Sequence, residues 1–169
     1  MKPLVIYGSS SLSGFTKEIL DRVMEGRDYT FVDLNTKDIS YYDYEHENRN
    51  DDFIDVANQM VAHEVIVFVT PVYWYSMSAQ LKVFFDRLTD LITIHKSVGH
   101  ALKGKKVFLI STGWATEYPQ SLEYPVKNTA EYFEMQYGGI LYFSSGLEKS
   151  SSNEQAALIK KFQENVFAL

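Results

Sequence analysis

The sequence predicts an α/β fold in which a doubly wound sheet of five parallel strands carries helices on both faces. Short apolar segments alternate with segments whose apolar residues recur at helical spacing, and this alternation is typical of βαβ units. Small, hydroxylic or aromatic residues follow three of the strands, at the ends where such a sheet binds ligands. No linker or repeat interrupts the 169 residues, so we expect residues 1–169 to form a single domain.

The composition excludes several classes of function. A net charge of −6 disfavours a nucleic-acid partner, because binding to a phosphate backbone needs a basic face. The absence of cysteine excludes disulfides, iron–sulfur clusters and a cysteine nucleophile. No segment resembles a signal peptide or a membrane span, so we expect a cytoplasmic protein. An aromatic content of 15% favours a flat ligand or an aromatic interface.

The first unit joins a strand, Leu4–Tyr7, to a helix through a loop rich in hydroxyl groups. All but two of the residues from Gly8 to Thr16 are small or hydroxylic, and we expect the helix to end at Gly26. Backbone N–H groups at a helix start favour an anion, so this loop is a candidate phosphate site. A nucleoside triphosphate is disfavoured, because five residues rather than four separate Gly8 from Gly14. The alternative is a serine-rich turn that only caps the helix.

The second unit begins with an expected strand at Thr30–Leu34, followed by a polar surface excursion at residues 35–50. His46 lies there among acidic residues, but such charges on a loop are usually solvated, and we expect no metal. A helix beginning near Asp51 carries apolar residues at the spacing of a core-facing side. We expect His63 to interact with the end of that helix.

The third unit holds the most informative stretch of the chain. The β-branched run Val65–Val69 is typical of a buried strand that ends at Thr70, and aromatic residues occupy positions 73–75. Because three adjacent large rings cannot all face one core, at least one should lie at a cleft beyond the strand. A helix capped by Ser78 then presents four residues to the core: Leu81, Phe84, Phe85 and Leu88. The alternative is a strand, turn and helix packed without a ligand.

A fourth strand and a second aromatic loop follow. Residues 94–106 form a basic connection that leads to the strand Val107–Ser111. Residues 112–119 follow that strand and include Trp114 and Tyr118. This loop is therefore expected at the same edge of the sheet as the two described above.

The last part of the chain is expected to contain two helices and one strand. The first helix should run from near Pro125, a good first-turn residue, to Gly138-Gly139, with inward side chains at Val126, Ala130, Phe133 and Tyr137. The fifth strand is expected at Ile140–Ser144. The closing helix is expected at Glu154–Ala168, with its apolar residues at Ala157, Leu158, Phe162 and Val166.

Two motifs give the chain a resemblance to a known family. Residues 11–16 fit the flavodoxin phosphate pattern of hydroxyl, any residue, hydroxyl, Gly, any residue, Thr. Residues 70–87 fit the P-x-Y-W…L-K…D-R signature of its oxidoreductase branch. The chain therefore resembles the flavodoxin-like NAD(P)H-dependent FMN oxidoreductases, which include NADPH-dependent FMN reductases and quinone reductases. The resemblance implies the strand order 2-1-3-4-5, with FMN at the switch point between strands one and three.

A receiver domain of the same topology does not fit these residues. That class needs acidic side chains after the first strand and at the end of the third. Gly8-Ser9 and Thr70-Pro71 occupy those places here.

The resemblance also implies roles for individual residues. The FMN phosphate would contact Ser9, Ser11, Ser13, Gly14, Phe15 and Thr16. The flavin ring and ribityl chain would border Pro71, Val72, Tyr73, Trp74, Tyr75 and Met77. A third wall would comprise Thr112, Gly113, Trp114 and Tyr118. No general acid or base is assigned, and Tyr73, Trp74 and Tyr118 are the candidates for contact with the ring.

One departure from the family concerns the phosphate loop. Family members often carry Arg or Lys in this loop, and this chain has Ser11 there. Neutral donors would therefore have to hold the phosphate.

Iron–sulfur relatives carry cysteines in the region that here spans residues 41–44, so cluster chemistry is excluded.

The implied function is that of an FMN-dependent oxidoreductase. Hydride would pass from NAD(P)H, through bound flavin, to a small-molecule acceptor such as a quinone, a nitro or azo compound or free flavin, in a ping-pong sequence. One alternative is a flavodoxin-type electron carrier without its own small-molecule substrate. Another is a flavin-free interaction domain on the same scaffold. We expect a homodimer or a higher homo-oligomer, because pockets completed by dimers are common in the family.

Overall fold

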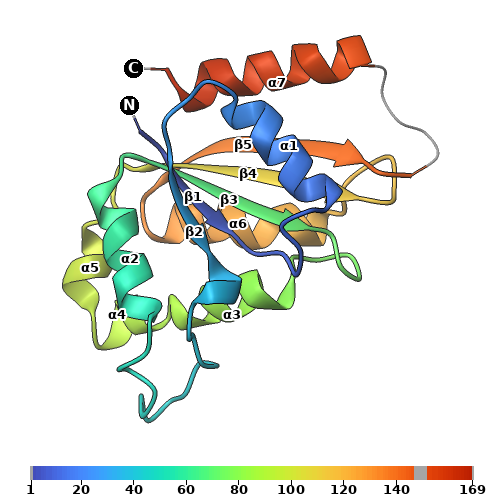
Figure 1. Ribbon diagram of the computed structural model, residues 1–169. Coiled ribbons are helices and arrows are strands. Elements are labelled where there is room, and N and C mark those ends of the chain that lie inside the picture. Colours follow the sequence, from blue (N-terminus) through green and yellow to red (C-terminus); the bar gives the residue numbers. More distant parts are fainter. Residues whose placement is uncertain (1, 147–151, 169) are drawn as a thin grey trace.

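The computed structural model describes residues 2–146 and 152–168, and its centre is one parallel sheet (Figure 1). The strand order is β2-β1-β3-β4-β5, which confirms the predicted 2-1-3-4-5 topology. The five strands are β1 (Leu4–Tyr7), β2 (Thr30–Asp33), β3 (Val65–Pro71), β4 (Lys106–Gly113) and β5 (Gln136–Ser144).

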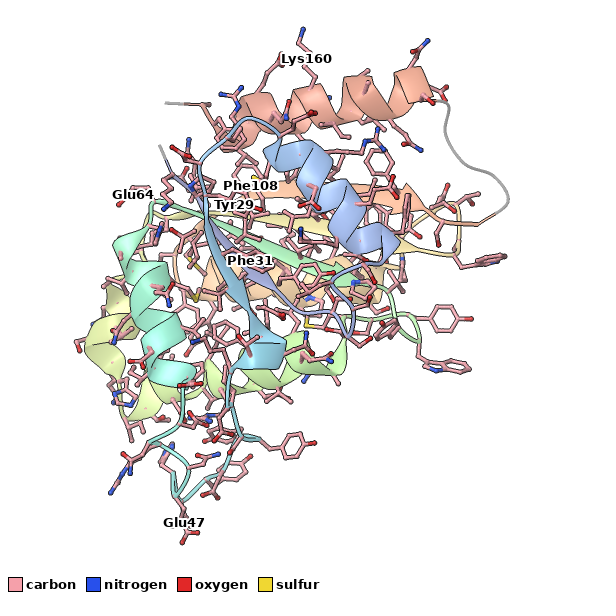
Figure 2. All side chains as sticks on the ribbon, in the orientation of Figure 1. Tyr29, Phe31, Glu47, Glu64, Phe108 and Lys160 are labelled. Atoms are coloured by element: carbon pink, nitrogen blue, oxygen red, sulfur yellow. The ribbon has the colours of Figure 1, made fainter. Side chains whose placement is uncertain are left out.

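Helices cover both faces of this sheet, as predicted. Helices α1 (Phe15–Met24) and α7 (Ser152–Val166) lie on one face, and Phe108 of β4 packs beneath α7 (Figure 2). The other face carries the 3-10 helix η1 (Leu34–Thr36) and five α-helices. These are α2 (Phe53–Ala62), α3 (Ala79–Arg87), α4 (Asp90–Thr93), α5 (Lys96–His100) and α6 (Gln120–Tyr132). Within the described ranges, no helix is both long and apolar enough to cross a bilayer.

The register brings the carboxyl ends of the strands to one edge of the sheet. Tyr7 at the end of β1 pairs with Val69 of β3, and Pro71 at the end of β3 pairs with Thr112 of β4. The arrowheads of β3, β4 and β5 point to the same side of the molecule (Figure 1). The loops after β1, β3 and β4 therefore share this edge, which we call the rim.

The predicted start of helix α6 was wrong. The helix begins at Gln120 and continues through Pro125, because Leu122 and Val126 bury one face of it against the core. Proline lacks one backbone N–H group and so removes one hydrogen bond, but the buried face on both sides of it holds the helix together. The helix ends at Tyr132.

The predicted role of Gly138-Gly139 as a helix stop was also wrong, because both glycines lie inside β5. A Cβ atom on Gly138 would lie 2.1 Å from the ring of Phe108, so only glycine lets β5 pack against that ring. The register shifts at the same place, between Val107 and Phe108, and Gly139 has a φ of +111°. The two glycines thus form an irregularity in the edge strand.

Two further expectations needed smaller corrections. Helix α7 buries Gln155, Ile159, Phe162 and Val166, whereas the predicted Ala157 and Leu158 are exposed. The predicted connection at residues 94–106 contains the short helix α5.

The expectations for two histidines can be compared directly with the structure. His63 Nδ1 lies 2.8 Å from the carbonyl oxygen of Gln59, so this side chain interacts with the end of α2 as predicted. His46 Nδ1 lies 3.1 Å from Asp90 Oδ1, and no cluster suited to a metal occurs among the residues that the structure describes. Glu47 lies at the outer end of the same excursion (Figure 2).

Candidate functional site

The loop between β1 and α1 has the features of an anion site. Gly14 is the N-cap of α1 and supplies no side-chain hydrogen bond to the first helical turn. Ser11 Oγ accepts from Ser13 N at 3.2 Å and lies 3.3 Å from Ser13 Oγ, so two exposed hydroxyl groups stand beside the helix start. A helix start without a side-chain cap retains N–H groups for an anion. We call residues 8–16 the anion loop.

Pairs of hydroxyl groups join the anion loop to its neighbours. Ser10 Oγ lies 2.9 Å from the Tyr73 hydroxyl oxygen, and Thr16 Oγ1 lies 2.7 Å from Thr112 Oγ1. In each pair one hydroxyl donates to the other, so the anion loop is bonded to the segment after β3 and to the end of β4. The three loops thus form one connected structure.

The segment after β3 is anchored at both ends by buried hydrogen bonds. Ser111 Oγ donates to the Thr70 carbonyl oxygen at 2.7 Å, and Ser78 N donates to Thr70 Oγ1 at 3.0 Å. Ser78 also caps α3 by accepting from Leu81 N at 3.3 Å, as predicted. Residues 71–77 therefore project from a fixed base.

Within that segment, residues 73–76 form a tight turn that exposes two large rings. Tyr73 N donates to the Ser76 carbonyl at 2.9 Å, and Ser76 N donates to the Tyr73 carbonyl at 3.1 Å. Trp74 and Tyr75 have φ values of 47° and 67°, in the left-handed region that large residues rarely adopt. Their side chains are 93% and 71% exposed. Strained backbone carrying exposed aromatic residues is a feature of ligand sites rather than of ordinary turns.

A hollow of about 530 Å³ lies between this turn and the segment after β4. Aromatic side chains dominate its lining, which comprises Val72, Trp74, Tyr75, Trp114, Ala115, Glu117, Tyr118, Pro119 and Tyr142. The rings of Tyr118 and Tyr142 meet edge to face with centroids 5.7 Å apart. The Tyr142 hydroxyl donates to the Ala115 carbonyl at 2.7 Å and so holds the segment after β4 against β5. An apolar concave surface with few polar groups suits a flat ligand.

Two of the tyrosines in the hollow are uncharged at neutral pH. Burial, and then the negative charge of Glu123, raise the pKa of Tyr118 above its ordinary value. Burial raises the pKa of Tyr142 as well. Both hydroxyl groups therefore remain protonated and act as hydrogen-bond donors.

Apart from Tyr73 and Gly113, the predicted cofactor-binding residues fall into three groups in the structure. Five of them line the hollow: Val72, Trp74, Tyr75, Trp114 and Tyr118. The anion loop contains Ser9, Ser11, Ser13, Gly14, Phe15 and Thr16, of which Ser9 and Thr16 are buried. Pro71, Met77 and Thr112 are buried at or near the strand ends.

Tyr73 and Gly113 have supporting positions. Tyr73 is not part of the lining and instead contacts Ser10 of the anion loop. A Cβ atom on Gly113 would lie 2.7 Å from the Tyr142 hydroxyl oxygen and 3.1 Å from Val72 Cβ. Glycine therefore allows the backbone after β4 to lie directly against both side chains.

Sequence reasoning missed Tyr142, which β5 contributes to the hollow. The prediction considered only the loops after the first, third and fourth strands. A signal was present, since the fifth strand of a parallel sheet ends at the same edge as the fourth. Residue 142, two positions before the end of the predicted strand, could have been included for that reason.

The end of the 70–87 motif lies away from the hollow. Arg87 is 1% exposed and contacts Asp51 and Asp90, with Nε 2.9 Å from Asp90 Oδ2 and Nη1 hydrogen-bonded to Asp51. Its guanidinium group lies 4.8 Å from the centre of the Phe53 ring. Burial alone would raise the pKa of Asp51, but hydrogen bonds from Arg87 and from backbone N–H groups outweigh it and lower the pKa. We call Arg87, Asp51 and Asp90 the ion cluster.

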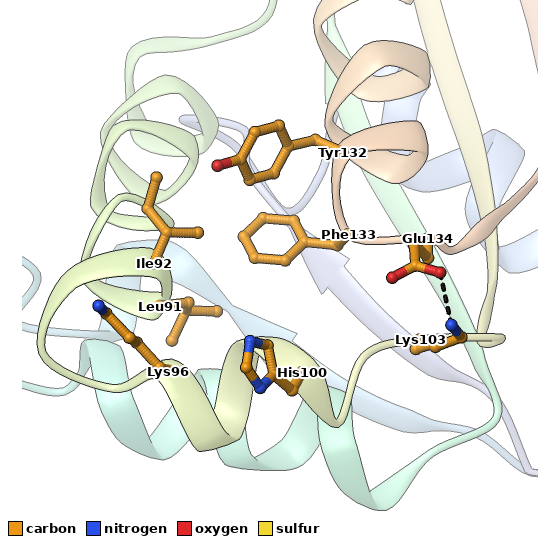
Figure 3. Close-up of a pocket in the computed structure, with 9 residues that line it drawn as sticks. Leu91, Ile92, Lys96, His100, Lys103, Tyr132, Phe133 and Glu134 are labelled. Carbon is orange, nitrogen blue, oxygen red and sulfur yellow. Dashed lines mark hydrogen bonds and ion pairs between the residues drawn. The ribbon is translucent and has the colours of Figure 1, made fainter.

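A second hollow, of about 600 Å³, lies between α4, α5 and the end of α6 (Figure 3). Leu91, Ile92 and Phe133 form its apolar wall, and Lys103 forms an ion pair with Glu134 at 2.6 Å. It lies beside the helices that precede and follow β4, not beside the loop at the carboxyl end of that strand. None of the predicted cofactor-binding residues lines it.

Known proteins share this sequence pattern and fold. The sequence model of a family described as NADPH-dependent FMN reductase matches residues 1–157. An uncharacterized NAD(P)H oxidoreductase of Bacillus subtilis, YdeQ, is 33% identical over 106 residues, which span 61% of this chain and 48% of that relative. The chain thus covers about half the length of this relative.

Solved structures agree with the fold. The Trp repressor binding protein from Bacillus subtilis superposes with a TM-score of 0.74 at 17% identity, over 99% of each chain. An FMN-dependent NADH-azoreductase from Bacillus anthracis, solved in complex with FMN, superposes with a TM-score of 0.66 at 12% identity, over 98% of each chain. Since the family model covers most of the sequence, the chain belongs to the NADPH-dependent FMN reductase family.

Proposed function

We propose that the rim binds FMN, with the phosphate on the anion loop and the flavin ring in the 530 Å³ hollow. Family membership supports the choice of cofactor. The observation that carries the proposal is that hydrogen bonds join the loop before an uncapped helix start to the two segments that carry the aromatic hollow. The Ser10–Tyr73 and Thr16–Thr112 hydrogen bonds make that connection.

The residues of the anion loop fit a phosphate group. A Cβ atom on Gly14 would lie 3.8 Å from the Cβ and Oγ atoms of Ser11, so Gly14 and the Ser11 hydroxyl lie side by side at the helix start. Ser11 and Ser13 offer hydroxyl groups there, and the helix dipole adds a favourable field. Residues 8–16 contain no lysine or arginine, so neutral donors would hold the phosphate, as the sequence predicts.

The residues of the hollow fit a flat ring. Trp74 and Tyr75 enter from the β3 side and Trp114 from the β4 side, and all three are largely exposed. Stacking of an aromatic ring on such side chains contributes on the order of 1 kcal/mol beyond the burial of area. Binding would also cover apolar surface that is otherwise in water.

We propose an oxidoreductase reaction with a small acceptor. FMN, when bound, would supply the redox chemistry, taking a hydride from NAD(P)H and passing it to a quinone, an azo or nitro compound or free flavin. The contribution of the chain is to bind and orient: its rings hold flat molecules in place, and the Tyr142 hydroxyl holds the segment after β4 in position by donating to the Ala115 carbonyl. Because one open hollow would receive both substrates in turn, we propose ping-pong kinetics.

Titration with FMN tests the binding site. Wild-type protein should bind FMN, and Gly14→Asp should weaken binding at least about a hundredfold, because a carboxylate would oppose the phosphate at close range. Asn58→Asp adds the same charge on the exposed side of α2 and should leave the dissociation constant unchanged. Equal FMN affinity of the wild type and Gly14→Asp would show that the anion loop does not bind the phosphate.

Steady-state kinetics test the activity. An oxidoreductase with its own substrate should oxidise NADH or NADPH continuously when a quinone is added to the FMN-loaded protein. Initial rates at several quinone concentrations should give parallel lines in double-reciprocal plots if the kinetics are ping-pong. An electron carrier of the flavodoxin type would show almost no turnover, and that result would favour the alternative function.

A further inference from the structure

Two backbone carbonyl groups of the anion loop are held by side chains from outside the loop. The Tyr7 hydroxyl donates to the carbonyl oxygen of Ser11 at 2.6 Å. Ser78 Oγ donates to the carbonyl oxygen of Gly8, also at 2.6 Å. Tyr7 is fully buried at the end of β1 and Ser78 is fully buried at the start of α3, so both bonds draw the carbonyl groups toward the protein interior.

A third carbonyl group of the loop is held from the β2 side. The side-chain amide of Asn35, in η1, donates to the carbonyl oxygen of Ser9. The same amide nitrogen donates to Asp33 Oδ1 at 2.8 Å, and Asn35 Oδ1 accepts from Gln80 Nε2 at 3.1 Å. These contacts fix the orientation of the amide, because one end donates and the other accepts.

We infer that Tyr7 and Asn35 are positioning residues for the phosphate group of FMN, an inference that rests on the proposed function. A carbonyl oxygen is the negative end of a peptide dipole, and an anion site needs the N–H ends to face the ligand. Each hydrogen bond to a carbonyl oxygen of the loop holds that oxygen away from the anion. The loop needs this support because residues 8–16 include no fixed cation to offset a carbonyl group that turns outward.

Tyr7 offers the cleanest test of the two. Tyr7→Phe removes one oxygen atom and keeps the ring, which packs among the buried residues beneath α1. Ser78 is less suitable, because its hydroxyl also caps α3. Asn35→Ala is the second variant, since Asn35 is exposed and its loss does not open the core.

The experiment compares the dissociation constants of FMN and riboflavin, which share the ring and differ in the phosphate. Tyr7→Phe and Asn35→Ala should each weaken FMN binding about tenfold, the effect of one lost hydrogen bond together with a freed carbonyl group near the anion. Riboflavin binding should change less than about twofold, because the hollow is untouched. A general loss of stability would not change the ratio of the FMN and riboflavin dissociation constants.

Tyr137→Phe is the matched control. Its hydroxyl donates to Glu123 Oε1 at 3.0 Å, so this variant also removes one hydrogen-bonded tyrosine hydroxyl, but from a half-buried side chain at the start of β5. Both affinities should stay at the wild-type level. Thermal unfolding of each variant shows that the protein measured is folded, and if Tyr7→Phe does not fold, Asn35→Ala decides.

Each outcome has a definite meaning. A loss of FMN affinity with riboflavin affinity retained supports the inference. Equal losses for the two ligands, or no loss, overturn it while leaving the proposed function in place. If the wild-type protein binds neither ligand, the proposed function fails, and the inference falls with it.

Discussion

The two ends of the 70–87 stretch can be compared, because one exposes large aromatic side chains and the other buries a charged one. At its start, Trp74 and Tyr75 place large rings in solvent on a backbone with left-handed φ values. At its end, Arg87 is almost completely buried between Asp51 and Asp90. The first arrangement costs stability and leaves surface free for a ligand, whereas the second satisfies every charge internally. One sequence signature therefore divides into a part that can bind and a part that holds the fold.

The ion cluster also explains how the rest of the fold supports the rim. Arg87 donates to the Ser40 carbonyl at 3.1 Å, and Asp51 accepts from Ser40 N at 2.8 Å. The polar excursion after η1 is thereby attached to α3 and α4. Since Ser78, the N-cap of α3, lies two residues after the aromatic turn, a firmly held α3 keeps that turn in place.

The largest expected effect comes from breaking the ion cluster. Arg87→Met should lower the free energy of unfolding by about 3–5 kcal/mol, because it removes the arginine charge that pairs with two buried carboxylates. Urea denaturation at neutral pH measures this. Lys82→Met is the control, since the Lys82–Asp86 pair is exposed and should contribute less than about 1 kcal/mol. If Arg87→Met bound FMN more weakly than the wild type but were equally stable, Arg87 would belong to the part of the stretch that binds the ligand.

The dependence of stability on pH should also differ between the wild type and Arg87→Met. The pKa of Asp51 is lowered in the folded state, so its stabilising effect is present above its ordinary value of 3.8 and is lost as the pH falls below that value. Wild-type stability should therefore decrease with acid. In Arg87→Met the hydrogen bond from Arg87 that lowers the pKa of Asp51 is lost while burial still raises it, so stability should fall less with acid than in the wild type. Parallel plots of unfolding free energy against pH for the wild type and Arg87→Met would contradict this account.

A smaller effect is expected where the rim meets the core. Gly8→Ala should destabilise the protein by about 1–3 kcal/mol, because the new methyl group overpacks the contact with α3. Its Cβ atom would lie 2.7 Å from Leu81 Cβ. Gly14→Ala is the comparison, since its Cβ atom would lie 3.8 Å from the nearest atoms, and only the N-cap preference for glycine, about 0.5 kcal/mol, should be lost. Equal unfolding free energies for the two variants would show that α3 can move.

The smallest expected effect has the opposite sign. Trp74→Gly should raise the free energy of unfolding by about 0.5–1 kcal/mol, because glycine adopts the φ of 47° without strain. The same change should remove most of the tryptophan fluorescence quenching that FMN causes in the wild type. Trp114→Gly, at a position without a positive φ, should not stabilise the protein. If Trp74→Gly is no more stable than the wild type, the backbone of the turn is not strained.

Most of the fold could be predicted from hydrophobic patterning, and the failures have local causes. The strand at Leu4–Tyr7 and the cap at Ser78 needed only neighbouring residues, so both were found. Pro125 and Gly138 misled the prediction, because a proline usually marks a helix start and a glycine pair usually marks a helix end. Gly138 is instead required by the ring of Phe108 in β4, a contact that no local pattern contains.

The sequence by itself determined the alternation of strands and helices, the two covered faces and the loops that meet at the rim, because these follow from periodicity and from the residues that end each strand. The strand order was implied by the resemblance to the flavodoxin-like family. Only the tertiary structure decided which aromatic residues form the hollow and that Tyr142 joins them. It also decided that Arg87 is internal and that Tyr7 and Asn35 hold the carbonyl groups of the anion loop. The physical reason is that such contacts join residues far apart in the chain, and their partners become neighbours only when the strands pair.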